Sequence, residues 1–144
     1  LDGRDVAKEI RTYDITVSIQ HAADNPAVRE QLVQWQRAAA EGASVVTEGR
    51  DQATVVFPHA ECKIFLTADE DERARRRHLD LTSRGENVCY EDVLADQHAR
   101  DERDCTRAVG ALRKAEDAIE VSTTGMTPDE VVARLEQIVR SKMP

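Results

Sequence analysis

Residues 62–68, Cys-Lys-Ile-Phe-Leu-Thr-Ala, form a short apolar run that has no polar alternation in its middle. A strand with one face in water alternates apolar and polar residues, whereas a strand covered on both faces of its sheet is a continuous apolar run. A second strand is expected at residues 117–122, Asp-Ala-Ile-Glu-Val-Ser. Helical patterns separate the two runs, so the order of elements predicts an α/β fold with parallel strands.

A charged helical hairpin is expected between the two strands. Residues 69–81 carry acidic residues early and arginines later, an order that complements the helix dipole. A break at residues 83–87 separates them from a second helix, expected from Tyr90 to about Arg107. A charged hairpin that buries little apolar surface is a candidate lid, which closes over phosphates and excludes water. The alternative for the run Arg75-Arg76-Arg77 is a surface segment paired with acidic residues one turn earlier.

Two further helices are expected outside this hairpin. From Pro26 to Glu41, apolar residues recur every three to four positions and a proline occupies the first turn, so an amphipathic helix is predicted. Thr127, Pro128 and Glu130 form a capping-box start for a C-terminal helix through Lys142. Its predicted buried face consists of Val131, Leu135, Ile138 and Val139.

The second helix of the hairpin carries a stripe of arginines. Arg100, Arg103 and Arg107 recur at helical spacing, and Asp104 falls on the same face. Guanidinium groups on one stripe repel each other unless an anion neutralises them, and their planar fork suits phosphate. The formal net charge is -8, so this local cluster indicates a small phosphorylated ligand and not nucleic acid. The alternative is a solvated helix whose arginines pair with nearby aspartates, namely Asp96, Asp101 and Asp104.

A second candidate site segment lies earlier in the chain. Residues 44–48 are expected to form a strand that ends at the turn Gly49-Arg50-Asp51. Ligands bind beyond the carboxyl ends of parallel strands, where Arg50 offers a phosphate fork and Asp51 accepts hydrogen bonds from amino or hydroxyl groups. Gly49 lets the backbone turn tightly. The alternative is an ordinary strand-ending turn capped by Asp51.

Composition narrows the class of protein. A chain of 144 residues fits one domain, and no apolar run approaches the roughly 20 residues that a membrane span requires. No charged-then-apolar leader opens the sequence, so we expect a cytoplasmic protein without membrane partners. Three widely spaced cysteines and four scattered histidines predict neither a disulfide framework nor a metal site.

Taken together, these motifs resemble those of bacterial cytidylate kinases, in order and in spacing. The resemblance extends over essentially the whole chain and implies the P-loop nucleoside monophosphate kinase fold, a parallel sheet flanked by helices with a helical lid. It implies a monophosphate-binding part at about 1–42, a lid hairpin at about 72–107 and a core formed by the remainder. The motifs that carry it are Gly49-Arg50-Asp51 with Thr54-Val55-Val56-Phe57-Pro58, Lys63-Ile64-Phe65-Leu66, Glu72-Arg73-Ala74 with Arg76-Arg77, and Arg100-Asp101-x-Arg103-Asp104-x-x-Arg107-Ala108-Val109.

The resemblance also implies an activity, namely transfer of the γ-phosphate of ATP to CMP or dCMP, assisted by magnesium, in a protein that is a monomer when complete. Site residues carry over by position. They are Arg29 and Asp51 for the cytosine, Arg50 for the acceptor phosphate, Arg100 and Asp104 for the sugar, Arg103 and Arg107 for the phosphates during catalysis, and Arg76 for ATP.

One feature of such kinases does not occur in this sequence. Kinases of this fold begin with a strand and a Gly-x-x-x-x-Gly-Lys-Ser/Thr loop whose amides hold the phosphates of ATP, and the 144 residues contain no Gly-Lys pair. We therefore expect an N-terminally truncated family member that is inactive alone. The family's first strand would lie between the strands at 44–48 and 63–68. Its loss leaves two unpaired sheet edges, so we expect the isolated chain either to rearrange or to self-associate through them.

Two alternatives remain at the level of the sequence. One is a noncatalytic nucleotide-sensing or interaction module that retains the acceptor site. The other is a related kinase with a different acceptor, which Arg29 and Asp51 would discriminate by whether they contact a pyrimidine.

Overall fold

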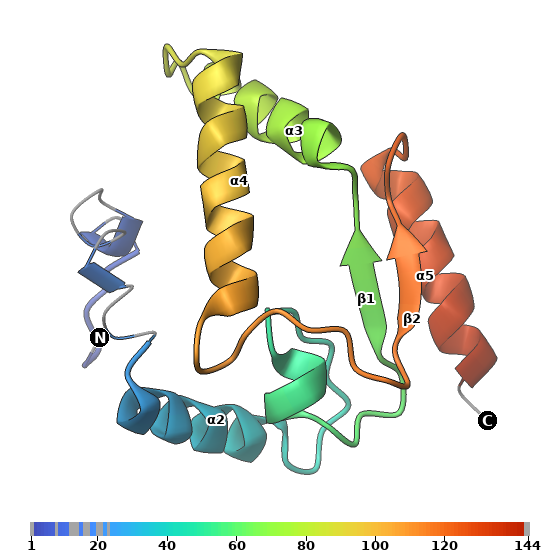
Figure 1. Ribbon diagram of the computed structural model, residues 1–144. Coiled ribbons are helices and arrows are strands. Elements are labelled where there is room, and N and C mark those ends of the chain that lie inside the picture. The colour runs from blue at the N-terminus through green and yellow to red at the C-terminus, as the bar shows by residue number, and fades with distance from the viewer. Residues whose placement is uncertain are drawn as a thin grey trace. The chain divides into compact units, whose positions relative to one another are not determined.

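The computed structural model describes residues 2–7, 9–11, 15, 18–19, 22 and 24–142. The chain divides into two compact units, Leu1–Thr47 with Arg107–Val109, and Glu48–Thr106 with Gly110–Pro144. The first unit contains the short helix η1 (Glu9–Arg11) and helix α2 (Pro26–Ala40). The second contains, in chain order, η2 (Gln52–Val56), β1 (Ile64–Thr67), α3 (Glu70–Ser83), α4 (Tyr90–Thr106), β2 (Ile119–Ser122) and α5 (Pro128–Lys142), as labelled in Figure 1.

Strands β1 and β2 form a parallel pair, which confirms the predicted α/β arrangement of these two segments. Ile64 lies opposite Ile119 and Thr67 lies opposite Ser122. The ladder continues past the strand ends, because the amide of Thr123 donates to the carbonyl of Thr67 at 2.7 Å. The predicted coverage of the first strand on both faces is wrong for the described residues, since Leu66 remains 50% exposed. Only two strands form the described sheet, which is too narrow to be enclosed.

Residues 44–48 do not form the predicted strand. Within the described part of the chain the sheet consists of β1 and β2, and Val46 is fully exposed. Strand geometry is stabilised by a ladder partner and a covered face, and the described residues supply neither for this segment. Beyond Gly49, residues 52–56 close into the single π-helical turn η2, in which the amide of Phe57 donates to the carbonyl of Gln52 at 2.7 Å.

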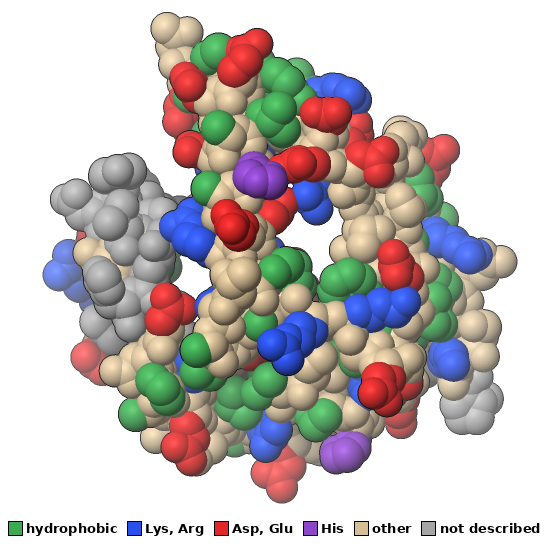
Figure 2. Space-filling model, in the orientation of Figure 1, with side chains coloured by type: hydrophobic (Ala, Val, Ile, Leu, Met, Phe, Trp, Pro, Cys, Tyr) green, Lys and Arg blue, Asp and Glu red, His purple; other side chains and the backbone are tan. Residues whose placement is uncertain are grey.

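Helices α3 and α4 form the predicted charged hairpin. Ala74 and Val93 are its buried residues, and acidic and basic side chains are interspersed over this part of the molecule in Figure 2. Polar contacts between the two helices include a hydrogen bond between His98 Nδ1 and Glu70 Oε1 at 2.8 Å. Exposed charged contacts of this kind each contribute at most about 1 kcal/mol, so Ala74 and Val93 supply the buried apolar contact of the hairpin.

Helix α2 has its predicted extent, but its apolar side is not buried. The side chain of Asn25 caps it, accepting from the amides of Ala27 and Val28 at 3.0 and 3.3 Å. Leu32 and Trp35 are 41% and 63% exposed, and no described residue of α2 is buried. The 3.6-residue period therefore predicts the helix correctly without identifying what covers it.

The capping box of α5 is confirmed. The amide of Thr127 donates to Glu130 Oε2 at 2.8 Å, and the amide of Glu130 donates back to Thr127 Oγ1 at 3.3 Å. The hydrogen bond from the Thr127 amide lowers the pKa of the Glu130 carboxyl. Ile138 is buried on the predicted apolar side of the helix.

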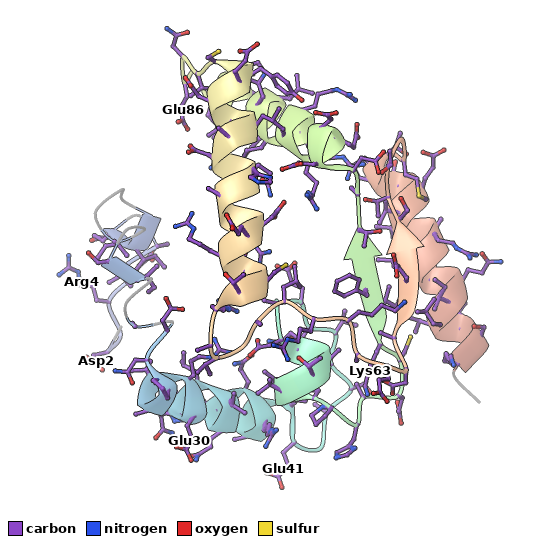
Figure 3. All side chains as sticks on the ribbon, in the orientation of Figure 1. Asp2, Arg4, Glu30, Glu41, Lys63 and Glu86 are labelled. Carbon is purple, nitrogen blue, oxygen red and sulfur yellow. The ribbon has the colours of Figure 1, made fainter. Side chains whose placement is uncertain are left out.

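A buried lysine joins the starts of the two strands. Lys63, labelled in Figure 3 at the beginning of β1, donates from Nζ to both carboxylate oxygens of Asp117 at 2.9 and 2.7 Å and also to the carbonyl of Pro58. The lysine is 9% exposed, so these acceptors compensate its burial. The hydrogen bond from Lys63 lowers the pKa of Asp117.

The described residues contain no candidate membrane-spanning helix. None of them combines the length and the apolar character that a bilayer crossing requires.

Candidate functional site

An Arg–Asp–Arg cluster lies where α4 meets the segment that precedes η2. Arg50 Nη1 forms an ion pair with Asp104 Oδ2 at 2.8 Å, and Arg100 Nε lies 3.9 Å from the same oxygen. The side chain of Asp104 is 15% exposed, whereas those of Arg50 and Arg100 are 33% and 59% exposed. One partly buried carboxylate therefore holds two guanidinium groups that still reach solvent.

The backbone around η2 orients Arg50 and its neighbour Asp51. The carbonyl of Asp51 accepts hydrogen bonds from the amides of Val55 and Val56 at 2.8 and 3.2 Å, and Asp51 is 6% exposed. A Cβ atom on Gly49 would lie 2.9 Å from the side chain of Gln52, so the turn before Arg50 is tight. Asp51 thus provides a carboxylate buried against η2, directly beside the cluster in sequence.

The other predicted site residues are distributed over the two units. Arg29, half-buried on α2, and Arg107 belong to the first unit, whereas Arg103 belongs to the second. Arg103 Nε donates to the carbonyl of Ala99 in its own helix at 3.1 Å. Of the predicted residues, the structure brings together Arg50, Arg100 and Asp104, with Asp51 adjacent to Arg50 along the chain.

Arg76, expected to bind ATP, contacts protein groups. Its guanidinium donates to the carbonyl of Thr123 at 2.6 Å, to Thr123 Oγ1 at 3.2 Å and to the carbonyl of Met126 at 3.3 Å. Its Nε donates to Glu72 at 2.9 Å. Arg76 thereby links α3 to the loop after β2. Its contact with Glu72, one turn earlier, is the pairing that the surface alternative for this arginine run predicts.

Neighbouring arginines of that run are paired within α3. Arg75 pairs with Glu72 at 2.6 Å, one turn earlier, and Arg77 pairs with Asp80 at 3.2 Å, one turn later. The pairing of Arg75 is the one that the surface alternative predicts, whereas Arg77 pairs with an acidic residue on the other side of it in sequence.

Sequence reasoning missed the link between the two hairpin helices. Arg73 Nη2 donates to Asp101 Oδ2 at 2.6 Å, and Gln97 donates to the other oxygen of Asp101 at 2.9 Å. The sequence analysis treated Asp101 as a partner for arginines of its own helix. Helical spacing carries no signal for a contact across the hairpin, so the sequence alone could not have paired Asp101 with Arg73.

The cluster has the donor set of an anion site and not of a metal site. Among the residues that the structure describes, no three His, Cys, Asp or Glu side chains gather closely enough to hold a metal ion.

Parallel strands and an arginine-bearing helical hairpin define an α/β protein, in which Arg50 and Arg100 share the carboxylate of Asp104. The family model described as cytidylate kinase matches residues 1–141. The chain therefore belongs to the cytidylate kinase family, which confirms the resemblance and implies the P-loop nucleoside monophosphate kinase fold and the use of ATP in that family.

Individual relatives agree with the family model. The chain is 51% identical over 140 residues to a cytidylate kinase of Rhodopirellula baltica, covering 97% of this chain and 61% of that protein. It is 48% identical to a cytidylate kinase of Carboxydothermus hydrogenoformans, covering 99% of this chain and 64% of the relative. For a cytidylate kinase of Vibrio cholerae the identity is 46%, with the same two coverages. The chain thus spans about three fifths of the length of these curated relatives.

Proposed function

We propose that the cluster around Asp104 is the acceptor site for CMP or dCMP in a protein that transfers the γ-phosphate of ATP to it. The observation that carries this proposal is the sharing of one Asp104 oxygen by Arg50 and Arg100. Membership of the cytidylate kinase family supports the identity of the ligand.

Arg50 binds the acceptor phosphate in this proposal. Its guanidinium already contacts one carboxylate oxygen, and a phosphate offers more charge and can bind a guanidinium in a bidentate manner. Moving from Asp104 to phosphate keeps Arg50 neutralised and frees Asp104 Oδ2. Asp104 then accepts hydrogen bonds from the sugar hydroxyls, with Arg100 one helical turn away as its partner.

Asp51 and Arg29 recognise the base. Cytosine presents an exocyclic amino donor beside ring acceptors, which a carboxylate and a guanidinium can bind respectively. Uracil presents a carbonyl where cytosine has its amino group, so the Asp51 carboxylate would face an acceptor and disfavour UMP. Burial of Asp51 raises the cost of that mismatch, because little water reaches the carboxylate.

The catalytic assignments concern the helical hairpin. Arg103 and Arg107 neutralise charge on the transferred phosphoryl group from the lid at about 72–107, and the monophosphate-binding part lies at about 1–42, some of it outside the described residues. ATP, when bound, supplies the transferable phosphoryl group. Arg76 reaches ATP only by exchanging its contacts with Thr123 and Met126 for the nucleotide.

This chain by itself is proposed to bind the acceptor without catalysing transfer. Its 144 residues contain no Gly-x-x-x-x-Gly-Lys-Ser/Thr motif, the element that holds the phosphates of ATP in kinases of this fold.

The test is calorimetric titration of the chain with CMP, compared between the parent and Asp104→Asn. Losing a charged hydrogen-bond acceptor costs about 1.5–3 kcal/mol, so we expect CMP affinity to fall roughly ten- to a hundredfold. The matched control is Arg84→Met, which breaks an exposed Arg–Asp pair within the hairpin, to Asp80 at 2.8 Å, and should leave affinity unchanged. Equal CMP affinity for the parent and Asp104→Asn would reject the proposed site.

A further inference from the structure

We propose that Arg73 and Asp101 are positioning residues of the acceptor site. Their ion pair fixes the rotation of α4 about its axis, and this rotation keeps Asp104 facing Arg50. The role of Asp104 toward CMP rests on the proposed function, whereas the effect of the pair on the Arg50–Asp104 contact does not.

Hydrogen bonds from two side chains restrain Asp101 in its pair with Arg73. Both carboxylate oxygens of Asp101 are engaged, one by Arg73 at 2.6 Å and the other by Gln97 at 2.9 Å. The side chains of Arg73 and Asp101 are 38% and 25% exposed, so the pair is half-buried. Arg73 Nε is buried without a hydrogen-bond partner in the described part of the chain, which leaves Asp101 as the charge that compensates this guanidinium.

The two aspartates of α4 connect it to two different segments of the second unit. Asp101 and Asp104 are three residues apart and therefore share one side of the helix. Asp101 contacts Arg73 in the first turn of α3, just after β1, and Asp104 contacts Arg50 before η2. A helix held at one point can turn about its axis, and a turn of one residue, about 100°, would move Asp104 away from Arg50. The contact of Asp101 with Arg73 and the contact of Asp104 with Arg50 together prevent this rotation.

Other charged pairs of the hairpin are less suited to this role. His98 pairs with Glu70 across the helices, but its side chain is 72% exposed, so solvent weakens the contact. Arg75, Arg77 and Arg84 pair within α3 or with its end and place no restraint on α4. Arg73–Asp101 is the half-buried charge pair that crosses the hairpin among the residues described.

The first experiment needs no ligand. A double-mutant cycle with Arg50→Met and Asp104→Asn measures their coupling in urea unfolding, first in the parent and then with Arg73→Met added. We expect a coupling of about fivefold in the unfolding equilibrium constant in the parent, falling to near onefold without Arg73. A coupling that stays the same without Arg73 would overturn the proposal. If Arg73→Met does not fold, the cycle is repeated with Arg73→Lys, which keeps the positive charge but removes the planar guanidinium group.

The second experiment measures CMP affinity. Arg73→Met and Asp101→Asn should each weaken binding about tenfold, and exchanging the charges in Arg73→Asp with Asp101→Arg should restore most of it. In an Asp104→Asn background, Asp101→Asn should have no further effect, because Asp104 is what the pair positions. Additive losses, or no rescue by the exchange, would show a structural role only.

The two experiments separate the two proposals. If the parent does not bind CMP, the proposed function fails, and the ligand-free cycle still decides whether Arg73 and Asp101 position Asp104. Arg84→Met is the control in both experiments, with no change expected.

Discussion

The hydrogen-bonded ion pair of Lys63 and Asp117 makes the stability of the folded chain depend on pH. The hydrogen bond from Lys63 lowers the pKa of Asp117 in the folded chain, so between this pKa and the ordinary one the unfolded chain binds more protons. The stability from this contact is therefore complete above the ordinary carboxyl pKa and is lost as the pH falls through the lowered one. Carboxyl NMR titration of Asp117 and urea unfolding across this range measure both effects.

The variant that tests this account is Lys63→Met. It should return the pKa of Asp117 toward its ordinary value and flatten the acid limb of the stability profile, because the donor is gone. Lys114→Met is the control, since Lys114 pairs with Glu120 at 2.9 Å and makes no contact with Asp117 in the described structure. An Asp117 titration that is the same with and without Lys63 would contradict the assignment.

Asp51 supports a prediction about base selectivity. In the proposed site its carboxylate accepts from the amino group of cytosine and faces the carbonyl of uracil unfavourably. Asp51→Asn supplies an amide donor, so CMP affinity should fall roughly tenfold while UMP affinity stays the same or rises. Parallel titrations with CMP and UMP measure the ratio. A ratio unchanged by Asp51→Asn would exclude this residue from base recognition.

For single residues, the sequence identifies the chemical type of a candidate site better than it identifies which residues contact each other. The arginine spacing on residues 100–107 and the Gly-Arg-Asp turn identify Arg100, Asp104 and Arg50 as candidate site residues. That Arg50 and Arg100 share the carboxylate of Asp104 comes from the structure. Nothing in the sequence indicates that Arg76 contacts Thr123, because that contact depends on how β2 and α3 are arranged in space. Periodicity describes one element at a time.

Among the elements, α5 allows a direct stability prediction. Thr127 caps the helix in a reciprocal pair with Glu130. Thr127→Ala should lower the free energy of unfolding by about 1 kcal/mol, as loss of an N-cap hydroxyl typically does. Thr106→Ala is a matched control, because the Thr106 hydroxyl only donates to the carbonyl of Glu102 within α4, at 2.7 Å. Equal unfolding free energies for the two variants would contradict the capping role.

The segment at residues 44–46 and the strand pair should differ in hydrogen exchange. The amides of Ile119 and Thr123 donate across the β1–β2 ladder at 2.9 and 2.7 Å, so they should exchange slowly. Amides at 44–46 lie outside any described strand, and Val46 is fully exposed, so they should exchange close to the rate of an unstructured peptide. NMR exchange in D₂O measures both. Protection at Val46 equal to that at Ile119 would show that a strand forms there.

Helices with capping or charge patterns in their own sequence were predicted correctly. The strand expected at residues 44–48, which needs a neighbouring strand, was not. The capping box, the dipole-matched charges of α3 and the proline-led start of α2 are local, and all three helices occur at the expected places. Residues 44–48 have strand composition, but a strand requires a neighbour to bond, which composition does not supply. The same dependence explains the exposure of Leu66 on β1.

For the whole molecule, the narrow sheet predicts self-association. A described sheet of two strands has open edges, and exposed apolar side chains such as Leu66 and Val46 favour pairing with a second copy. Sedimentation velocity should show a concentration-dependent dimer that Leu66→Lys weakens. A monomer at all concentrations would contradict this expectation. Leu79→Lys, the same substitution at an exposed leucine of α3, is the control for the effect of the added charge.

In the proposed function, this chain of the cytidylate kinase family contains the acceptor site for CMP. The most direct measurement is calorimetric titration of the same preparation with CMP and, separately, with ATP. We expect saturable binding of CMP and none of ATP, because Arg50, Arg100 and Asp104 already lie together and the phosphate-loop motif does not occur in the 144 residues. A folded chain that binds neither nucleotide, or binds ATP and not CMP, would contradict it.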